Sequence, residues 1–278
     1  MKMDITPDNW PDHYWNYLAQ LEVHAIDKNH HALKPWDELA EKCMNLAIKA
    51  PFLKGKETGS KSLKLAAAFL KRVMSDFRGV WLLINWGYPY QAACVASSLY
   101  ENALVVNCIS GRDDLAEEIL ADENGDVPWK PQRLSKMAAQ RDLFGEIKNN
   151  PPSDKDFEQA WKLCYHNYKL LCKMKHPTLQ QIKDETSHAT NKQGQFAVIP
   201  LPDTRESSVG LKQMIMVIAI SKLFSAAKCF AQSSNCSDDD EFHQEFYNFA
   251  AEVYSDLKNH ISTSGIGSIP IKATGFKF

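Results

Sequence analysis

The sequence lacks the short motifs that mark the most familiar enzyme classes. It contains no GxxxxGK[ST] phosphate loop, no GxGxxG dinucleotide fingerprint, no GxSxG nucleophile elbow and no HExxH zinc motif. Each of these motifs places reactive groups at a defined turn or helix face. Their absence removes the sequence signal for nucleotide phosphate binding, for serine hydrolase chemistry and for common zinc sites.

Paired cysteines and long apolar runs are also missing. Seven cysteines are scattered along the chain without a CxxC pair, a pattern typical of small buried thiols in a reducing compartment. The start of the chain has no basic region followed by an apolar run, and no stretch approaches the roughly 18 consecutive apolar residues that a membrane span requires. We therefore expect a cytoplasmic protein with no membrane contact.

An excess of positive charge is absent as well. The formal net charge is −2 at pH 7, which excludes the bulk attraction on which a general nucleic-acid-binding protein depends. A role in nucleic-acid binding would therefore need a local basic patch. With 44% hydrophobic residues, the 278-residue chain can bury a substantial core.

Apolar residues recur at helical spacing, whereas the alternating pattern of strands is nearly absent. Residues 28–34, which include His30 and His31, are predicted to form a loop, and these histidines receive no role. The predicted helices cover residues 12–27, 35–49, 60–86 and 90–108, a short acidic stretch after Gly111, residues 133–148 and 154–175, a short stretch after Thr178, and residues 207–232 and 237–260.

The fold class that follows is all-α, a helical bundle with long central antiparallel helices and a short extended or hairpin insertion at residues 195–202. The helix at 90–108 is apolar on nearly every side and is predicted at the centre, whereas the helix at 133–148 has little apolar surface and is predicted to be exposed. We expect an N-terminal helical extension at 1–59, a main bundle at 60–261 and a C-terminal tail at 262–278.

One predicted helix carries a stripe of basic side chains. Its members are spaced four, three, four and three residues apart, which places them on one helical face; they are Lys162, His166, Lys169, Lys173 and His176. Imidazole is well suited to proton transfer near neutral pH, and the lysines could hold a phosphodiester. The alternative is a solvated basic face without a binding function.

Glu101 is the second candidate residue. With Ser97 and Ser98 it lies within one turn of an otherwise apolar helix, so its carboxylate should be paired or should face a cavity. A structural ion pair with Lys169, Lys173 or His176 explains Glu101 as well as a catalytic role does.

These two segments resemble parts of a known superfamily. Residues 87–105, GYPYQAACVASSLYENALV, are similar to a helix of bacterial HEPN proteins (higher eukaryotes and prokaryotes nucleotide-binding) that begins at glycine and ends in arginine, two or three small or aromatic residues, and glutamate. Residues 166–177, HNYKLLCKMKHP, resemble a later helix of that superfamily, which ends in histidine. The similarity extends over residues 60–232.

The resemblance implies a metal-independent endoribonuclease of the toxin or abortive-infection type that needs no cofactor, with RNA as substrate and a homodimer or a partner protein as its assembly. It implies that His176 and Glu101 are catalytic and that Lys169, Lys173, His166 and Lys162 bind the substrate. However, Ser97 stands where the superfamily has its first arginine, and lysines stand near the second. Lysine cannot reproduce the bidentate contact of a guanidinium with phosphate. A non-catalytic relative is therefore an equal alternative.

Two other classes of function stay open. A carboxylate-bridged metal site in a helical bundle would use the acid-x-x-His spacing of Glu185 with His188 and of Asp240 with His243. A helical interaction or scaffold protein would need exposed apolar surface, and the tryptophans that could supply it in or near loops are Trp10, Trp15, Trp36 and Trp129.

Overall fold

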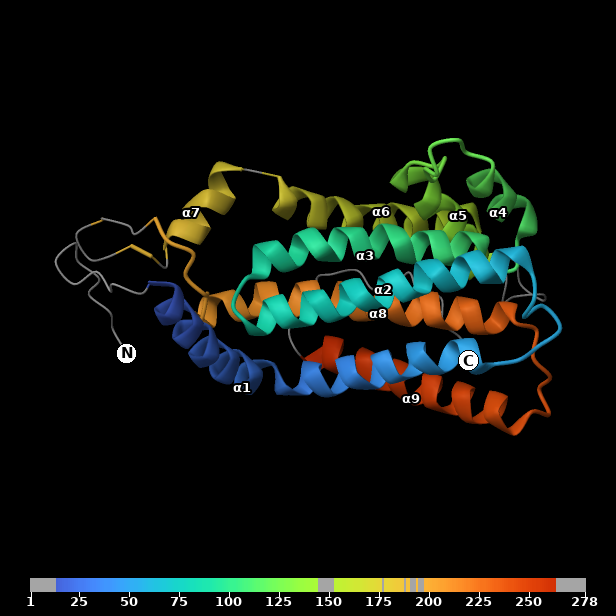
Figure 1. Ribbon diagram of the computed structural model, residues 1–278, viewed down its shortest axis with the longest axis horizontal. Helices are drawn as coiled ribbons and strands as arrows, with labels where there is room; N and C mark the ends of the chain where they lie inside the picture. The colour runs from blue at the N-terminus through green and yellow to red at the C-terminus, as the bar shows by residue number, and fades with distance from the viewer. Residues whose placement is uncertain are drawn as a thin grey trace.

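The computed structural model is an elongated bundle of helices (Figure 1) and describes residues 14–144, 153–176, 178–187, 189–190, 194 and 198–263. The prediction of an all-α fold is confirmed, because the described residues form helices and no strand. The elements in chain order are α1 (Tyr14–Lys49), the 3-10 helix η2 (Ala50–Phe52), α2 (Lys61–Asn85), α3 (Pro89–Ile109), α4 (Asp113–Leu120), α5 (Pro131–Phe144), α6 (Asp154–Lys175), α7 (Leu179–Ser187), the 3-10 helix η3 (Glu206–Ser208), α8 (Val209–Ser233) and α9 (Glu241–Thr263).

Helices α2, α3 and α8 form the centre of the bundle. Both α3 and α8 are apolar around most of their circumference, as a helix that is covered on all sides must be. Helices α1 and α9 pack on one side of this centre, and α5 and α6 pack on the other (Figure 1). The predicted central position of the helix at 90–108 is therefore correct.

A tight turn joins α2 to α3 and makes them antiparallel. Gly87 has a φ of +84°, and a Cβ atom at this position would lie 2.8 Å from the backbone nitrogen of Asp203. That nitrogen donates a hydrogen bond of 2.8 Å to the carbonyl oxygen of Gly87. Glycine is required here for the turn and for the close approach of the segment that precedes α8.

The predicted loop at residues 28–34 is wrong, because α1 runs without a break from Tyr14 to Lys49 and bends along its length (Figure 1). Pro35 lies inside the helix, where it removes one backbone hydrogen bond. Tertiary contacts outweigh this cost. The side chains of Leu33 and Trp36 are buried, and the amide of Asn29 donates a 3.0 Å hydrogen bond to the carbonyl of Asn85.

Two further expectations need correction. Helix α5 is not an exposed helix, because its small side chains allow close packing against α3 and α6, and its buried residues include Leu134, Ala138 and Ala139. Of the four tryptophans considered for an interaction surface, Trp36 and Trp129 pack into the core, Trp15 is 81% exposed, and Trp10 lies outside the described residues.

The predicted limits of the extension, bundle and tail stay a prediction, although one apolar cluster continues across residue 59 and joins Leu46 to Leu63. Residues 195–197 of the predicted insertion lie outside the described part, and residues 198–202 form neither helix nor strand.

Two helices are long and apolar enough to cross a membrane by length and composition. They are α3 and the stretch Glu206–Ser233, and 72% and 83% of their most apolar windows are buried inside the bundle. Buried core helices pass the same test, so the expectation of no membrane contact stays a prediction.

Candidate functional site

The predicted basic stripe lies along the outer face of α6. Ser153 begins this helix with a capping box, in which its hydroxyl accepts a hydrogen bond from the backbone nitrogen of Asp156 and the Asp156 side chain reaches back. His176 ends the helix as its C-cap. The five stripe residues, whose spacing predicted one shared helical face, are all exposed; they are Lys162, His166, Lys169, Lys173 and His176.

The positive charge of the stripe is concentrated in its C-terminal half. The ammonium of Lys162 lies 2.6 Å from the carboxylate of Glu158, so its charge is locally balanced. Lys169 lies 5.0 Å from the ring centroid of Tyr165 on the same helix. Within the described residues, no acidic side chain forms an ion pair with Lys169 or Lys173.

The neighbouring helix α5 extends this basic surface. The ammonium of Lys136 lies 4.5 Å from the ring centroid of Trp161, which Lys162 also approaches at 5.8 Å. Such cation–π contacts hold a flexible lysine near an aromatic face without neutralising its charge. The stripe is therefore the edge of a wider basic surface that includes one residue of α5.

Glu101 is joined to α6, but not to the stripe. The hydroxyl of Tyr168 donates a 2.5 Å hydrogen bond to its carboxylate. Burial and the hydrogen bonds with Cys172 and Glu101 raise the pKa of the Tyr168 phenol above its usual range. Tyr168 faces α3, whereas Lys169 follows it by one residue and is turned about 100° away around the helix.

The expected ion pair of Glu101 with Lys169, Lys173 or His176 is therefore wrong, because Tyr168 occupies the position facing Glu101. Nor does any contact join Glu101 to His176 in the described part of the chain. Glu101 can fix the orientation of α6 through Tyr168, but the structure does not bring it beside the predicted catalytic histidine.

The residues considered for a metal site give no ligand cluster. In the described ranges, no group of three or more His, Cys, Asp or Glu side chains could hold a metal ion. Asp240 accepts a hydrogen bond from the backbone nitrogen of His243, which is a capping contact. Glu185 lies on α7, and its predicted partner His188 lies outside the described residues.

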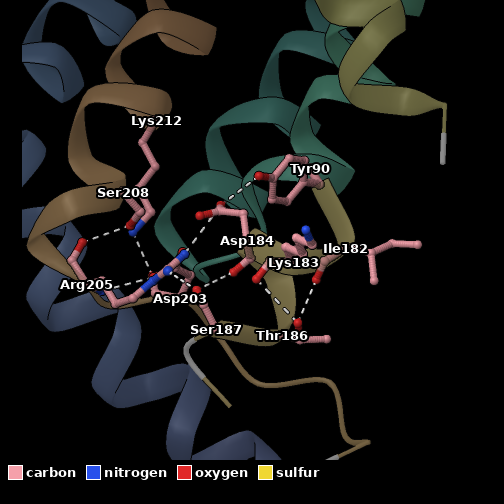
Figure 2. A network of polar contacts seen from close by, with 10 residues as sticks. All are labelled: Tyr90, Ile182, Lys183, Asp184, Thr186, Ser187, Asp203, Arg205, Ser208 and Lys212. Carbon is pink, nitrogen blue, oxygen red and sulfur yellow. Dashed lines mark hydrogen bonds and ion pairs between the residues drawn. The ribbon is translucent and has the colours of Figure 1, made fainter. Parts of the chain in front are cut away.

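A polar network that the sequence analysis missed lies at one end of the bundle (Figure 2). At its centre is Lys212, whose side chain is fully buried near the start of α8. Its ammonium donates to the side-chain oxygen of Asn29 at 2.8 Å and to the carbonyl of Asp203 at 2.6 Å. Burial lowers the pKa of Lys212 to about 8, against the opposing effect of the nearby Asp203 carboxylate.

Arg205 connects this centre to α7. Its guanidinium lies 2.6 Å from the carboxylate of Asp203 and 3.5 Å from that of Asp184, which also accepts a 2.7 Å hydrogen bond from the Tyr90 hydroxyl. Burial acts to raise the pKa of Asp203, but its hydrogen bonds and charge pairing with Arg205 outweigh burial and leave that pKa below its usual value.

The arrangement in Figure 2 binds protein segments to one another, and its partly exposed charges on Arg205 and Asp184 are paired within the network. Lys212 is enclosed, and both of its hydrogen bonds are made within the protein. The sequence signal that could have revealed it is a lysine within the apolar start of α8, next to the stretch MIMVIAI. The exposed stripe on α6 therefore remains the better candidate site.

Comparisons of the chain with family models, with curated proteins and with solved structures found no match.

Proposed function

We propose that the protein is a HEPN-like helical protein that binds RNA through the C-terminal half of the α6 stripe and acts in a bacterial defence or toxin system. The observation that supports this proposal is the exposed set His166, Lys169, Lys173 and His176, in which neither lysine has an acidic partner among the described residues. Unpaired cations on one helical face attract phosphates without reading the base sequence.

The dimensions of this face suit a short run of phosphates. Residues 166–176 cover about 15 Å along the helix, because each residue advances it by about 1.5 Å. The aromatic ring of Tyr165 beneath Lys169 also limits the freedom of that side chain. A partly held lysine loses less conformational entropy when it binds a phosphate.

In the catalytic form of this proposal, His176 takes the proton from a ribose 2′-hydroxyl, whose oxygen attacks the adjacent phosphorus. The bond from phosphorus to the 5′-oxygen breaks, which leaves a 2′,3′-cyclic phosphate, and His176 returns the proton to the departing 5′-oxygen. Lys169 and Lys173 stabilise the negative charge that develops on the phosphate oxygens. None of these steps needs a metal ion. Binding without cleavage needs only the lysines, and this is the form expected if an arginine is indispensable to the chemistry.

The salt dependence of RNA binding tests the proposal. For a single strand, the slope of log K against log salt concentration is about −0.7 for each phosphate contact. Lys169→Ala and Lys173→Ala should each make the slope less steep by about 0.7 in fluorescence anisotropy titrations. The matched control is Lys162→Ala, because Glu158 already balances this lysine. Equal slopes for all three variants and the wild type would contradict the proposal.

Cleavage is tested separately with a labelled RNA at low salt. His176→Ala should abolish cleavage and leave binding intact, whereas His166→Ala, one turn from Lys169 and Lys162, should still cleave. A wild-type protein that binds RNA without cutting it would assign the non-catalytic form.

A second candidate function, protein interaction, is favoured by a different observation. The start of α1 and helix α7 lie at the same end of the bundle (Figure 1), and both helices carry exposed large apolar side chains. Trp15 is 81% exposed, Val23 67% and Leu179 78%. Sedimentation should then show a homodimer that Trp15→Ser with Leu179→Ser dissociates. Phe52, in the 3-10 helix that follows α1, is 63% exposed, so Phe52→Ser is the control.

A further inference from the structure

A cluster of reactive side chains surrounds Cys164, between α3, α6 and α8. The sulfur of this half-buried cysteine lies 3.2 Å from the hydroxyl of Tyr100 and 3.5 Å from the ammonium nitrogen of Lys222. Lys222 also lies 4.6 Å from the ring centroid of Tyr100, which fixes its position over that ring. One thiol is thus held between a phenol and an amine from two other helices.

The remaining cysteines have different surroundings. Three are buried, and their thiols donate to main-chain carbonyls: Cys43 to Ile220, Cys108 to Leu134 and Cys229 to Asn107. The other three are half-buried and are Cys94, Cys172 and Cys236. Cys164, by contrast, has a lysine nitrogen within hydrogen-bond distance of its sulfur.

We propose that Cys164 and Lys222 form a reversible covalent cross-link, a sulfenamide, when the protein meets a peroxide. The Cys164 sulfur attacks one oxygen of hydrogen peroxide and breaks the O–O bond, which gives a sulfenic acid and one water. Lys222 gives its ammonium proton to water, and the neutral amine then attacks the same sulfur. An S–N bond forms, the S–O bond breaks, and the hydroxyl leaves with an amine proton as a second water.

The electrons balance in this sequence, because the sulfur loses two electrons and the peroxide gains two. A dithiol reductant reverses the step: it is oxidised to a disulfide, the S–N bond breaks, and its two hydrogen atoms restore the free cysteine and lysine. The geometry favours the second step, because a separation of 3.5 Å between nitrogen and sulfur is already close to the distance at which bound reactants combine.

The cross-link would tie α6 to α8 across the face of α3. Helix α6 packs against α3 and α5 on one side of the bundle, whereas α8 lies in the core. The bond would close a loop between residues 164 and 222, so the oxidised protein should melt at a higher temperature than the reduced protein. This inference does not rest on RNA binding.

The test uses the full-length protein, treated with increasing hydrogen peroxide and then with iodoacetamide to block free thiols. Mass spectrometry of a proteolytic digest should find a linked pair of peptides that contains Cys164 and Lys222 and is lighter than their sum by two hydrogen atoms. Dithiothreitol should release the pair. The linked species should be absent from Cys164→Ser and from Lys222→Arg, whose guanidinium is a poor nucleophile.

Cys172→Ser is the matched control, because it removes another half-buried thiol from the same helix and should leave the link intact. Circular dichroism of each untreated variant checks that it is folded. The proposal is overturned if Cys164 is recovered only as sulfenic or sulfinic acid. It is also overturned if every cross-linked peptide pair that contains Cys164 is a disulfide with another cysteine. It is equally overturned if Lys222→Arg still gives a reducible link at Cys164.

Discussion

At the scale of single residues, Lys212 is a lysine whose side chain is fully buried. Its ammonium is enclosed near the start of α8, and its hydrogen-bond acceptors are an amide oxygen and a main-chain carbonyl. Neutral acceptors compensate a buried charge less completely than a carboxylate does. The charge of Asp203 lies nearby but is directly paired with Arg205. This explains why burial dominates the pKa of Lys212.

The first prediction follows from this pKa. The pKa of Lys212 is about 8 in the folded protein, whereas an unburied lysine, as in the unfolded chain, has a pKa of 10.5. Between these values the unfolded chain binds more protons, so the free energy of unfolding should rise with pH, by an amount on the order of 3 kcal/mol over the whole interval. Below pH 8 both states are protonated and the full cost of burial is present.

Urea unfolding at pH 7.5, 8.5 and 9.5 checks this, because these values bracket the start of the interval. The stability of the wild type relative to Lys212→Met should increase with pH, whereas the same comparison with Lys71→Met, an exposed lysine of α2, should stay flat. A difference that is independent of pH would show that Lys212 keeps an ordinary pKa.

A second prediction concerns Glu101 and the residue that holds it. Because Tyr168 donates to its carboxylate, Tyr168→Phe should cost about 1 kcal/mol of stability and should couple to Glu101→Gln in a double-mutant cycle. Lys169→Ala should combine additively with Glu101→Gln, since Lys169 faces away. Thermal melts of the single and double variants measure both cycles. If Glu101→Gln couples with Lys169→Ala and not with Tyr168→Phe, Glu101 is paired with Lys169 and the prediction is contradicted.

At the scale of elements, local signals predict helix ends better than helix continuity. The helix predicted at 154–175 matches α6 at both ends, because Ser153 caps its start and Pro177 follows its end in the sequence. By contrast, the polar residues before Pro35 read as a loop, yet α1 continues through them. The deciding contacts come from Asn85 and Lys212, which lie far away in the sequence.

The same distinction applies to the sites. The stripe is a property of spacing along one helix, so its shared face could be predicted. The network in Figure 2 draws on α3, α7, the segment before α8 and α8 itself, and Lys212 joins it to Asn29 of α1. No spacing within any one of these elements reveals it. The partner of Glu101 could not be predicted for the same reason, because Tyr168 lies on another helix, 67 residues further along the chain.

The third prediction concerns α7. None of its described side chains is buried, and Asp184 attaches it to the bundle through Tyr90 and Arg205. Asp184→Ala should therefore loosen α7 without unfolding the bundle. Hydrogen exchange of the α7 amides should accelerate by about tenfold or more, the effect of losing about 1.4 kcal/mol of local stability. Core amides of α3 should be unaffected.

Lys183→Ala changes the neighbouring exposed residue and controls for the effect of substitution within this short helix. Its α7 amides should exchange at the wild-type rate. Unchanged exchange in Asp184→Ala would mean that apolar contacts, and not the polar network, hold α7 in place.

At the scale of the whole molecule, net charge and charge distribution lead to different expectations. The chain has a net charge of −2. The segment of α6 and its C-cap between residues 166 and 176 nevertheless contains no acidic residue, and its stripe residues are exposed. Acidic side chains gather elsewhere, for example at the start of α4, where Asp113 and Asp114 complement the positive end of the helix. Attraction to RNA would therefore act only at close range and would weaken steeply with salt.

The core determines how the molecule unfolds. The apolar cluster runs from α1 through α2, α3 and α8 to α9 without a boundary at residue 59. Residues that share one continuous core lose their packing together, which is the physical basis of a cooperative transition. The segment predicted as an N-terminal extension should then behave as part of the bundle and not as a separate unit.

The fourth prediction is that Leu46→Ala destabilises the entire protein. Leu46 is fully buried in α1, so its truncation should cost about 2–5 kcal/mol. Ile48, two residues away and 48% exposed, is the control, and Ile48→Ala should change stability far less. Circular dichroism and tryptophan fluorescence should follow a single urea transition that Leu46→Ala moves as a whole. Two transitions, of which only one responds to Leu46→Ala, would instead make residues 14–59 an independent folding unit, because a cavity in one core cannot destabilise a second core with which it shares no contacts.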